Sequence, residues 1–357
     1  MKRSANKILH IICNDKFIDH FYNLINQQFN KDCHSFIYLN DASPEEYPIP
    51  EAKNVININN QFIGPKKIWG LIKFIKPHFC HADKVIIHGL FSINLIRFLF
   101  FYQYFLKKCF WVMWGGDLYA PQLSKSKSLK ARINLFIAKK VKGKFKGYVT
   151  YLRGDFELAQ KLYNAKGEFH ECIMYPSNLY KEFQLPKKHS NIRTILVGNS
   201  ADISNLHAEI FNKLSSLEDQ NFEIICPLSY GSKKYAKYVS ELGISMFSGR
   251  FKPLMTFMPF EDYLKLLSEV DIAIFAHKRQ QAMGNTITLL GQGKTVYMRN
   301  DVTPFTLFKE LDISVFDFNE FELGLCDELT VNKNQKNVKN YFSEKNLVKQ
   351  LQNIFED

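Results

Sequence analysis

The feature that most constrains this chain is an alternation of short apolar runs with amphipathic helical patterns over most of its length. Short runs rich in Ile, Val, Phe and Tyr are typical of strands buried on both faces of a sheet. The amphipathic segments between them are typical of helices that connect one parallel strand to the next. The pattern therefore predicts an α/β fold built on parallel sheets.

The alternation falls into two blocks that are separated by a segment without a period. In the first block, strands are expected at residues 8–13, 35–39, 85–88, 110–114, 147–151 and 172–174, and helices at 17–29, 66–75, 93–106 and 155–163. In the second block, strands are expected at 192–198, 222–226, 244–247, 271–275 and 295–298, and helices at 205–217, 233–242, 260–268 and 284–290.

The interruption at residues 175–191 is rich in polar residues and contains two prolines, which is typical of a linker. With 357 residues available, we predict two domains, 1–178 and 179–342. The helical segment 343–357 either completes the second domain or packs back on the first. In open parallel sheets ligands bind at the carboxyl ends of the strands, so two such domains around a cleft suggest an enzyme with two substrates.

Composition limits the partners and the compartment. The formal charge of +12 favours phosphorylated small molecules, nucleic acid or an anionic bilayer as partners. Seven cysteines without a C-x-x-C pair suggest neither a disulfide framework nor a zinc site, which fits a reducing cytoplasm. The most apolar segment, 98–106, is well short of the ~20 apolar residues that a spanning helix needs.

One candidate ligand loop follows the first strand of the second block. An apolar run leads into Gly198, then into Asn199 and Ser200, with Ser204 or Asn205 as a candidate helix N-cap. Glycine allows the backbone to approach a ligand closely, and the polar side chains and helix amides can donate to phosphate or ribose oxygens. The alternative is an ordinary strand-to-helix loop with a good cap.

A second candidate loop follows the strand expected at 271–275 and precedes an apolar helix. It combines cations and amides with a Gly-Asn-Thr sequence, and a planar guanidinium beside a helix N-terminus suits a diphosphate. The residues of this candidate anion site are Arg279, Gln280, Gln281, Gly284, Asn285 and Thr286. The alternative is a solvated Lys-Arg loop, although His277 also lies at this strand end.

In the first block, Asp117 follows a strand and the pair Gly115-Gly116. It could act as general base toward an acceptor hydroxyl or orient the acceptor by hydrogen bonding. His88 lies at another strand end, where a neutral imidazole could share or take over the role of base. The alternatives are an aspartate that caps a turn and a structural histidine.

A strongly basic segment separates Asp117 from Asp155, with no acidic residue between them. Apolar residues are interleaved with the cations, as on a surface that rests on anionic headgroups. The residues expected at this membrane surface include Lys125, Lys127, Lys130, Arg132, Lys139 and Lys140. Nucleic acid is the rival partner, but no helix-turn-helix, RNP or zinc-finger signature accompanies the cations.

Several segments together resemble a known family. They are 111–119 (WVMWGGDLY), 151–155 (YLRGD), 195–207 (ILVGNSADISNLH), 260–267 (FEDYLKLL) and 279–286 (RQQAMGNT). In this order and spacing they are similar to the TDP-N-acetylfucosamine:lipid II N-acetylfucosaminyltransferases of enterobacterial common antigen synthesis, glycosyltransferase family 56. The resemblance implies a GT-B fold, with two Rossmann-like domains facing across a cleft, the acceptor on the first domain and the TDP-sugar on the second. It also implies that Asp117 and His88 face the acceptor. The residues that it implies for donor binding are Gly198, Asn199, Ser200, Asn205, Arg279, Gln280, Gln281, Gly284, Asn285 and Thr286.

The resemblance also implies the chemistry. The donor sugar would be N-acetylfucosamine (4-acetamido-4,6-dideoxygalactose), and the acceptor an undecaprenyl-diphosphate-linked glycan at the cytoplasmic face of the bacterial inner membrane. No metal is expected. No cofactor is expected either, because the TDP-sugar is a substrate. The turn reads Gly115-Gly116 where the family has Gly-Ala. A same-fold transferase for another sugar and acceptor, or a non-catalytic sugar-nucleotide-binding module, is therefore the alternative.

Overall fold

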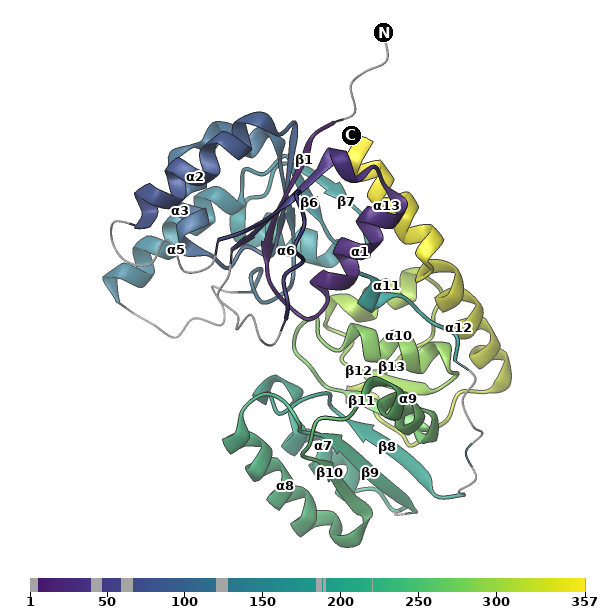
Figure 1. Cartoon of the computed structure of the whole chain (residues 1–357). Helices are drawn as coiled ribbons and strands as arrows, with labels where there is room; N and C mark the ends of the chain where they lie inside the picture. Colours follow the sequence, from purple (N-terminus) through teal and green to yellow (C-terminus); the bar gives the residue numbers. More distant parts are fainter. Residues whose placement is uncertain are drawn as a thin grey trace. The chain divides into compact units, whose positions relative to one another are not determined.

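A computed structural model describes residues 6–39, 47–58, 67–119, 128–183, 188, 191–219 and 221–356. The chain forms two compact units (Figure 1). The first comprises Met1–Ser177 together with Glu344–Asp357, and the second comprises Asn178–Ser343. Each unit contains one parallel sheet whose strands are joined by helices, as the alternating sequence pattern predicts.

The sheet of the first unit has the strand order β3-β2-β1-β4-β5-β6-β7. Its strands are β1 (Ile8–Cys13), β2 (His34–Leu39), β3 (Val55–Asn57), β4 (Lys84–His88), β5 (Cys109–Val112), β6 (Gly147–Val149) and β7 (Glu168–His170). Its helices are α1 (Ile18–Gln28), α2 (Lys67–His81), α3 (Ile93–Phe101), α5 (Leu129–Lys142), α6 (Arg153–Tyr163) and α13 (Glu344–Glu356). Successive strands are added toward one edge of the sheet from β1 to β3 and toward the other edge from β4 to β7. The strand order therefore reverses between β1 and β4, which is the ligand-binding position of such sheets.

Helices cover both faces of this sheet. Figure 1 shows α1 and α13 on one side, and α2, α3 and α5 on the other. The C-terminal helix thus belongs to the first unit, where Gln350 Oε1 accepts a hydrogen bond from Ile173 N at 2.9 Å and the Phe355 ring contacts His34 at 4.8 Å. Side chains alternate along a strand, so His10 of β1 faces α1 and α13 while its neighbours Leu9 and Ile11 enter the apolar core on the other side.

The sheet of the second unit has the order β10-β9-β8-β11-β12-β13. Its strands are β8 (Arg193–Val197), β9 (Phe222–Pro227), β10 (Phe251–Leu254), β11 (Ile272–Phe275), β12 (Thr295–Met298) and β13 (Phe316–Asp317). Its helices are α7 (His207–Ser215), α8 (Lys233–Phe247), α9 (Phe260–Glu269), α10 (Met283–Gly291), α11 (Thr303–Glu310) and α12 (Glu328–Tyr341). Here the order reverses between β8 and β11, so the loops after these two strands lie at the ligand position.

Two expected strands are wrong. Residues 244–247 belong to helix α8, whose buried residues Ala236, Val239, Gly243 and Phe247 recur at helical spacing. Gly243 packs so closely on β10 that a Cβ there would lie 2.4 Å from the Phe251 ring, and β10 itself follows at Phe251–Leu254.

Residues 172–174 are buried but not a strand, because Met174 has a φ of +66° and Ile173 bonds to α13 rather than to a sheet neighbour. Strand β7 is formed upstream, at Glu168–His170. The short edge strands β3 and β13 and the helices α5, α11 and α12 were not expected from the sequence.

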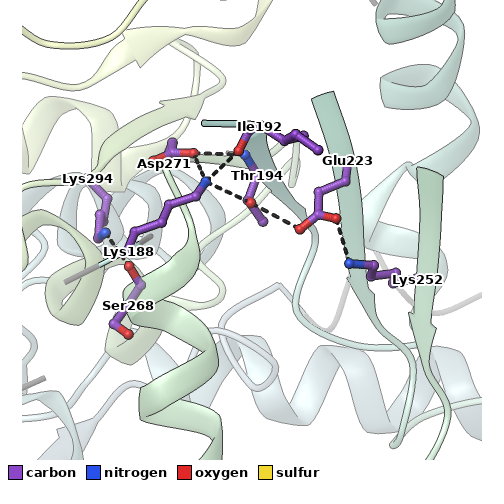
Figure 2. Close-up of polar contacts among 8 residues, drawn as sticks. All are labelled: Lys188, Ile192, Thr194, Glu223, Lys252, Ser268, Asp271 and Lys294. Carbon is purple, nitrogen blue, oxygen red and sulfur yellow. Dashed lines mark hydrogen bonds and ion pairs between the residues drawn. The ribbon is translucent and has the colours of Figure 1, made fainter. Parts of the chain in front are cut away.

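The start of the second sheet is fixed by a polar network at its amino edge (Figure 2). Lys188 Nζ donates to the carboxylate of Asp271 and, at 2.9 Å, to Thr194 Oγ1. Asp271 also accepts from Thr194 N at 2.8 Å, and Thr194 Oγ1 donates to Glu223 at 3.2 Å. The network ties the segment before β8 to β9 and β11 at the edge opposite the candidate site.

Candidate functional site

Gly198 directly follows β8, at the position where the second sheet reverses its strand order. Its φ is +68°, and its N–H donates to Ile274 O of β11 at 3.0 Å. A Cβ at this position would lie 2.8 Å from both Asn205 Oδ1 and His207 Nε2. Only glycine allows the chain to turn here while the loop folds back on itself.

Asn205 is the centre of this loop and is fully buried. Its Nδ2 donates to Ser200 Oγ at 3.2 Å and to Asp202 O at 3.0 Å. Its Oδ1 accepts from Asn199 N and lies 2.8 Å from His277 Nε2, which is therefore the donor. Asn205 is a positioning residue, and its predicted direct contact with the donor is not supported, because both N–H groups and both acceptor positions of its amide are used within the protein.

The predicted N-cap at Ser204 or Asn205 is wrong. Helix α7 begins at His207, and its N-cap is Leu206, which has a φ of +55° and makes no side-chain cap bond. Asp202 instead caps the short 3-10 helix Ile203–Asn205 by accepting from Ser204 N.

The two predicted donor loops meet through their side chains. Gln281 Nε2 donates to Asn199 Oδ1 at 3.1 Å, and Ser204 Oγ donates to Gln281 Oε1 at 2.7 Å. Asn199 Nδ2 in turn donates to the hydroxyl of Tyr230 at 2.8 Å. Loops after β8, β9 and β11 therefore form one polar network at the carboxyl edge of the sheet.

Tyr230 was missed by the sequence reasoning. It is 49% exposed and follows β9 in a Ser-Tyr-Gly sequence. A polar aromatic residue just past a strand at the predicted ligand edge was the available signal.

Arg279 and the start of α10 form the anion-attracting part of this network. Arg279 is half-buried, and Ala282, with a φ of +58°, precedes α10 without making a side-chain cap bond. The amides of Gly284 and Asn285 lie in the first turn, where the helix dipole favours negative charge. Gln280 is also half-buried, and its carbonyl oxygen accepts from Arg279 Nη1 at 3.4 Å.

Two predicted donor side chains at α10 have other partners. Thr286 is buried, and its hydroxyl donates to Ala282 O within its own helix at 3.0 Å. Asn285 Nδ2 donates to the hydroxyl of Tyr263 at 2.9 Å. The Thr286 side chain thus stabilises the first turn of α10 instead of facing a ligand.

The histidine behind these loops is neutral. Burial first, and then the positive charge of Arg279, lowers the pKa of His277 to about 3. A neutral imidazole that donates from Nε2 holds Asn205 without adding charge to the anion-attracting edge.

In the first unit, Asp117 is 1% exposed and its carboxylate accepts four hydrogen bonds from the protein. The donors are Leu90 N (2.8 Å), Trp111 Nε1 (2.6 Å), Trp114 N (2.9 Å) and Leu118 N (2.9 Å). Both oxygens are occupied, so Asp117 joins the turns after β4 and β5. This arrangement favours the structural alternative over the predicted general base.

His88 is fully buried, and both of its ring nitrogens have partners. Nε2 lies 3.0 Å from His10 Nδ1, and Nδ1 lies 2.8 Å from the Tyr175 hydroxyl. Burial lowers the pKa of His88 to about 3. The histidine therefore belongs to an internal hydrogen-bond chain, and the predicted role as acceptor-facing base is not supported.

Four of the six predicted membrane-surface cations lie exposed on α5: Lys130, Arg132, Lys139 and Lys140. Lys125 and Lys127 lie outside the described residues. The same helix exposes the apolar residues Leu129, Ile133 and Phe136 at helical spacing, between these cations. Structure thus combines positive charge with an apolar row on one helix face.

No helix in the described part of the chain is long and apolar enough to cross a membrane. Among the described residues there is also no group of three or more His, Cys, Asp or Glu side chains arranged to hold a metal ion.

Two doubly wound parallel units with polar loops at their carboxyl edges define a GT-B protein. The chain is similar to sucrose-phosphate synthase from Thermosynechococcus elongatus (TM-score 0.69, 8% identity, 98% of each chain covered). It is also similar to a glycosyltransferase from Rickettsia africae (TM-score 0.63, 16% identity, covering 99% of this chain and 98% of the other). A third similar structure is HepE from Anabaena, solved with UDP and glucose (TM-score 0.64, 14% identity, 98% of each chain covered).

The family is defined by sequence. The family model described as 4-alpha-L-fucosyltransferase glycosyl transferase group 56 matches residues 10–339, nearly the whole chain. The chain belongs to this family and is a glycosyltransferase. The predicted fold class, family and enzyme class are confirmed.

Proposed function

We propose that this glycosyltransferase moves N-acetylfucosamine from TDP to an undecaprenyl-diphosphate-linked glycan during synthesis of a bacterial surface polysaccharide such as enterobacterial common antigen. The observation that carries the proposal is the family match over residues 10–339, together with the joined polar loops at the carboxyl edge of the second sheet. The second unit binds the donor, and the first binds the acceptor.

The donor diphosphate lies at the start of α10. Arg279 and the amides of Gly284 and Asn285 neutralise the charge that develops on the departing TDP. Asn199, Gln281 and Tyr230 offer polar groups to the rest of the nucleotide-sugar. HepE has been solved with UDP and glucose, which supports a nucleotide-sugar as the donor. Because Arg279 and the helix dipole supply positive charge, no metal and no cofactor are required.

The acceptor reaches the first unit from an anionic bilayer. The exposed apolar row Leu129, Ile133 and Phe136, flanked by lysines and arginine on α5, supports peripheral binding at the cytoplasmic face of the inner membrane. An acceptor carried on a lipid makes such a surface useful, because the enzyme then meets its substrate in the plane of the membrane. Nucleic acid is not a partner in this proposal.

Calorimetry with TDP, UDP and GDP tests the donor half. We expect TDP to bind most tightly, and Arg279→Ala to weaken it about tenfold or more, since a hydrogen bond to a charged group contributes about 1.5–3 kcal/mol. Lys278→Ala, which removes the exposed neighbouring cation, is the matched control and should bind nearly as the parent does. Absence of nucleotide binding by the parent would overturn the donor assignment.

Transfer assays separate the remaining alternatives. With TDP-N-acetylfucosamine and an undecaprenyl-diphosphate-linked acceptor, we expect product that depends on both substrates. Transfer from a UDP- or GDP-sugar instead would indicate another donor within the same family. TDP binding with no transfer from any sugar would identify a non-catalytic module.

A further inference from the structure

Three aromatic rings meet at the carboxyl edge of the first sheet, one after each of three strands. Phe17 follows β1, Phe91 follows β4, and Trp114 follows β5. The Trp114 ring lies 4.8 Å from Phe17 at 70° and 5.7 Å from Phe91 at 58°, measured between centroids and ring planes. Phe91 is 46% exposed, and the other two rings are half-buried. We call these three residues the aromatic strip.

The aromatic strip lies where a substrate is expected to bind on the first sheet. Strands β1 and β4 are the pair at which the first sheet reverses its order, where ligands of open parallel sheets bind. Glycine makes room for the rings: Gly89 has a φ of +72°, and a Cβ there would lie 2.8 Å from Phe91 and 3.0 Å from Trp114. The rings thus lie directly on backbone at the strand ends.

A buried hydrogen-bond chain fixes the orientation of the Trp114 ring from below. Trp114 Nε1 donates to the Tyr175 hydroxyl at 2.7 Å, and that hydroxyl lies 2.8 Å from His88 Nδ1. His88 continues to His10, and His10 Nε2 lies 3.0 Å from His34 Nδ1. The chain crosses the face of the sheet from the start of β2 to the carboxyl edge of β4.

The direction of the chain follows from the chemistry of its ends. An indole N–H can only donate, so the Tyr175 oxygen accepts from Trp114. Every link is then satisfied when Tyr175 donates to His88 Nδ1 and each histidine donates from Nε2 to the next Nδ1. Burial lowers the pKa of His34 to about 4 and that of His88 to about 3, so this arrangement is uncharged at neutral pH.

We propose that Trp114 and Phe91 form the stacking platform for a sugar ring of the acceptor glycan, and that Tyr175, His88, His10 and His34 are positioning residues that hold the indole. This inference deepens the proposed function and rests on its assignment of the acceptor to the first unit. A pyranose has an apolar face of C–H groups and a polar rim, which matches the face of an indole ring whose polar N–H is already bonded, with the tilted Phe91 ring at its side.

The lipid chain of the acceptor is the competing occupant, and the structure favours the sugar. The strip lies at the strand ends where the reacting group must bind, and the half-buried Asp15, two residues before Phe17, places a carboxylate near it in the chain. A separate apolar row on α5, flanked by cations, already suits the lipid surface.

The test measures binding of soluble glycans by calorimetry in the absence of donor. The probes are methyl glycosides of hexosamine-containing mono- and disaccharides, with farnesyl diphosphate as the lipid probe. Trp114→Ala and Phe91→Ala should each weaken glycan binding about tenfold, with TDP affinity unchanged. The matched control is Phe101→Ala, a ring on α3 that is 69% exposed and outside the strip, and it should bind as the parent does.

Two further variants separate positioning from folding. Trp114→Phe keeps an apolar ring, so it should fold as the parent does and weaken glycan binding by a smaller factor than Trp114→Ala. Tyr175→Phe keeps its own ring but removes the acceptor of the indole N–H. It should raise the acceptor KM about threefold with little change in kcat.

The outcomes are distinct. Glycan affinity within twofold of the parent in Trp114→Ala, or no binding of any glycan probe by the parent, overturns the platform. Loss of farnesyl diphosphate binding with glycan binding retained assigns the strip to lipid and also overturns it. Because the glycan binding of Trp114→Ala and Phe91→Ala is measured without donor or transfer, a wrong donor sugar in the proposed function leaves that result unaffected.

Discussion

At the scale of single residues, the donor edge depends on backbone geometry as much as on polar side chains. Gly198 has a positive φ and leaves no room for a Cβ between Asn205 and His207. This glycine brings Asn199 N within 2.8 Å of Asn205 Oδ1 and thereby directs the Asn199 side chain toward Gln281 and Tyr230.

Gly198→Ala should therefore destabilise the fold by about 1–3 kcal/mol and weaken TDP binding. The measurements are denaturant unfolding and calorimetry with TDP. Gly249→Ala is the matched control, because a Cβ there has no atom within 4 Å. Equal TDP affinity in Gly198→Ala and its parent would contradict the assignment of this loop to the donor.

Asp117 illustrates how a motif can be important without performing chemistry. Its carboxylate is the common acceptor for two turns and the buried indole N–H of Trp111. Asp117→Ala should cost about 3–5 kcal/mol of folding free energy, since it leaves several buried donors unpaired. Thermal unfolding measures this loss. A variant that lost turnover while keeping its Tm would restore the role of general base.

At the scale of elements, α5 combines two surfaces. Its buried residues Val141 and Lys142 face the unit, where Lys142 Nζ donates to Asp117 O at 2.5 Å. Its opposite face exposes the apolar row and the cations. The buried face anchors the helix on the unit, because a helix of this length is stable only when packed. The opposite face carries the apolar row and the cations that a membrane surface would contact.

The double variant Lys139→Glu/Lys140→Glu should lower binding to vesicles containing anionic lipid by about tenfold or more, because each nearby cation contributes about 1 kcal/mol. Sedimentation with anionic and neutral vesicles measures the effect. Lys336→Glu, an exposed lysine on α12, is the control for charge reversal elsewhere. Tight, salt-sensitive binding to duplex DNA by the parent would favour the nucleic-acid alternative instead.

At the scale of the whole molecule, buried neutral histidines make stability depend on pH. Burial lowers the pKa of His34 and His207 to about 4, and that of His88 and His277 to about 3. Burial lowers the pKa of His10 as well. The unfolded chain takes up these protons near pH 6.5, whereas the folded chain does not. The contribution of these neutral histidines to the free energy of unfolding is therefore fully present above pH 6.5, and it is lost as the pH falls toward 4 and 3.

Stability should therefore decrease steeply below pH 6.5, with each such histidine adding about 1.4 kcal/mol per pH unit to the slope. Denaturant unfolding at pH 7.5, 6.5 and 5.5 measures the slope. His34→Gln should make it shallower, and His20→Gln, an exposed histidine on α1, should leave it unchanged. A slope unaffected by His34→Gln would show that this ring is not the source.

Sequence alone determined the features that repeat along the chain. Apolar runs such as Ile8–Cys13 require a partner on each face, and their alternation with amphipathic helices indicated two parallel α/β units. Motif order indicated the family, and glycines and polar residues after strands indicated the donor edge. These signals are local, so they can be recognised in the sequence without knowledge of contacts between distant segments.

Tertiary structure decided what depends on contacts between distant segments. His88 and Asp117 look reactive at strand ends, but partners 78 and 87 residues from His88, and 27 residues from Asp117, occupy their polar atoms. Residues 244–247 have strand-forming composition, yet packing of Gly243 on Phe251 keeps them in α8. A polar group's availability is set by what lies against it, and only the folded chain determines that.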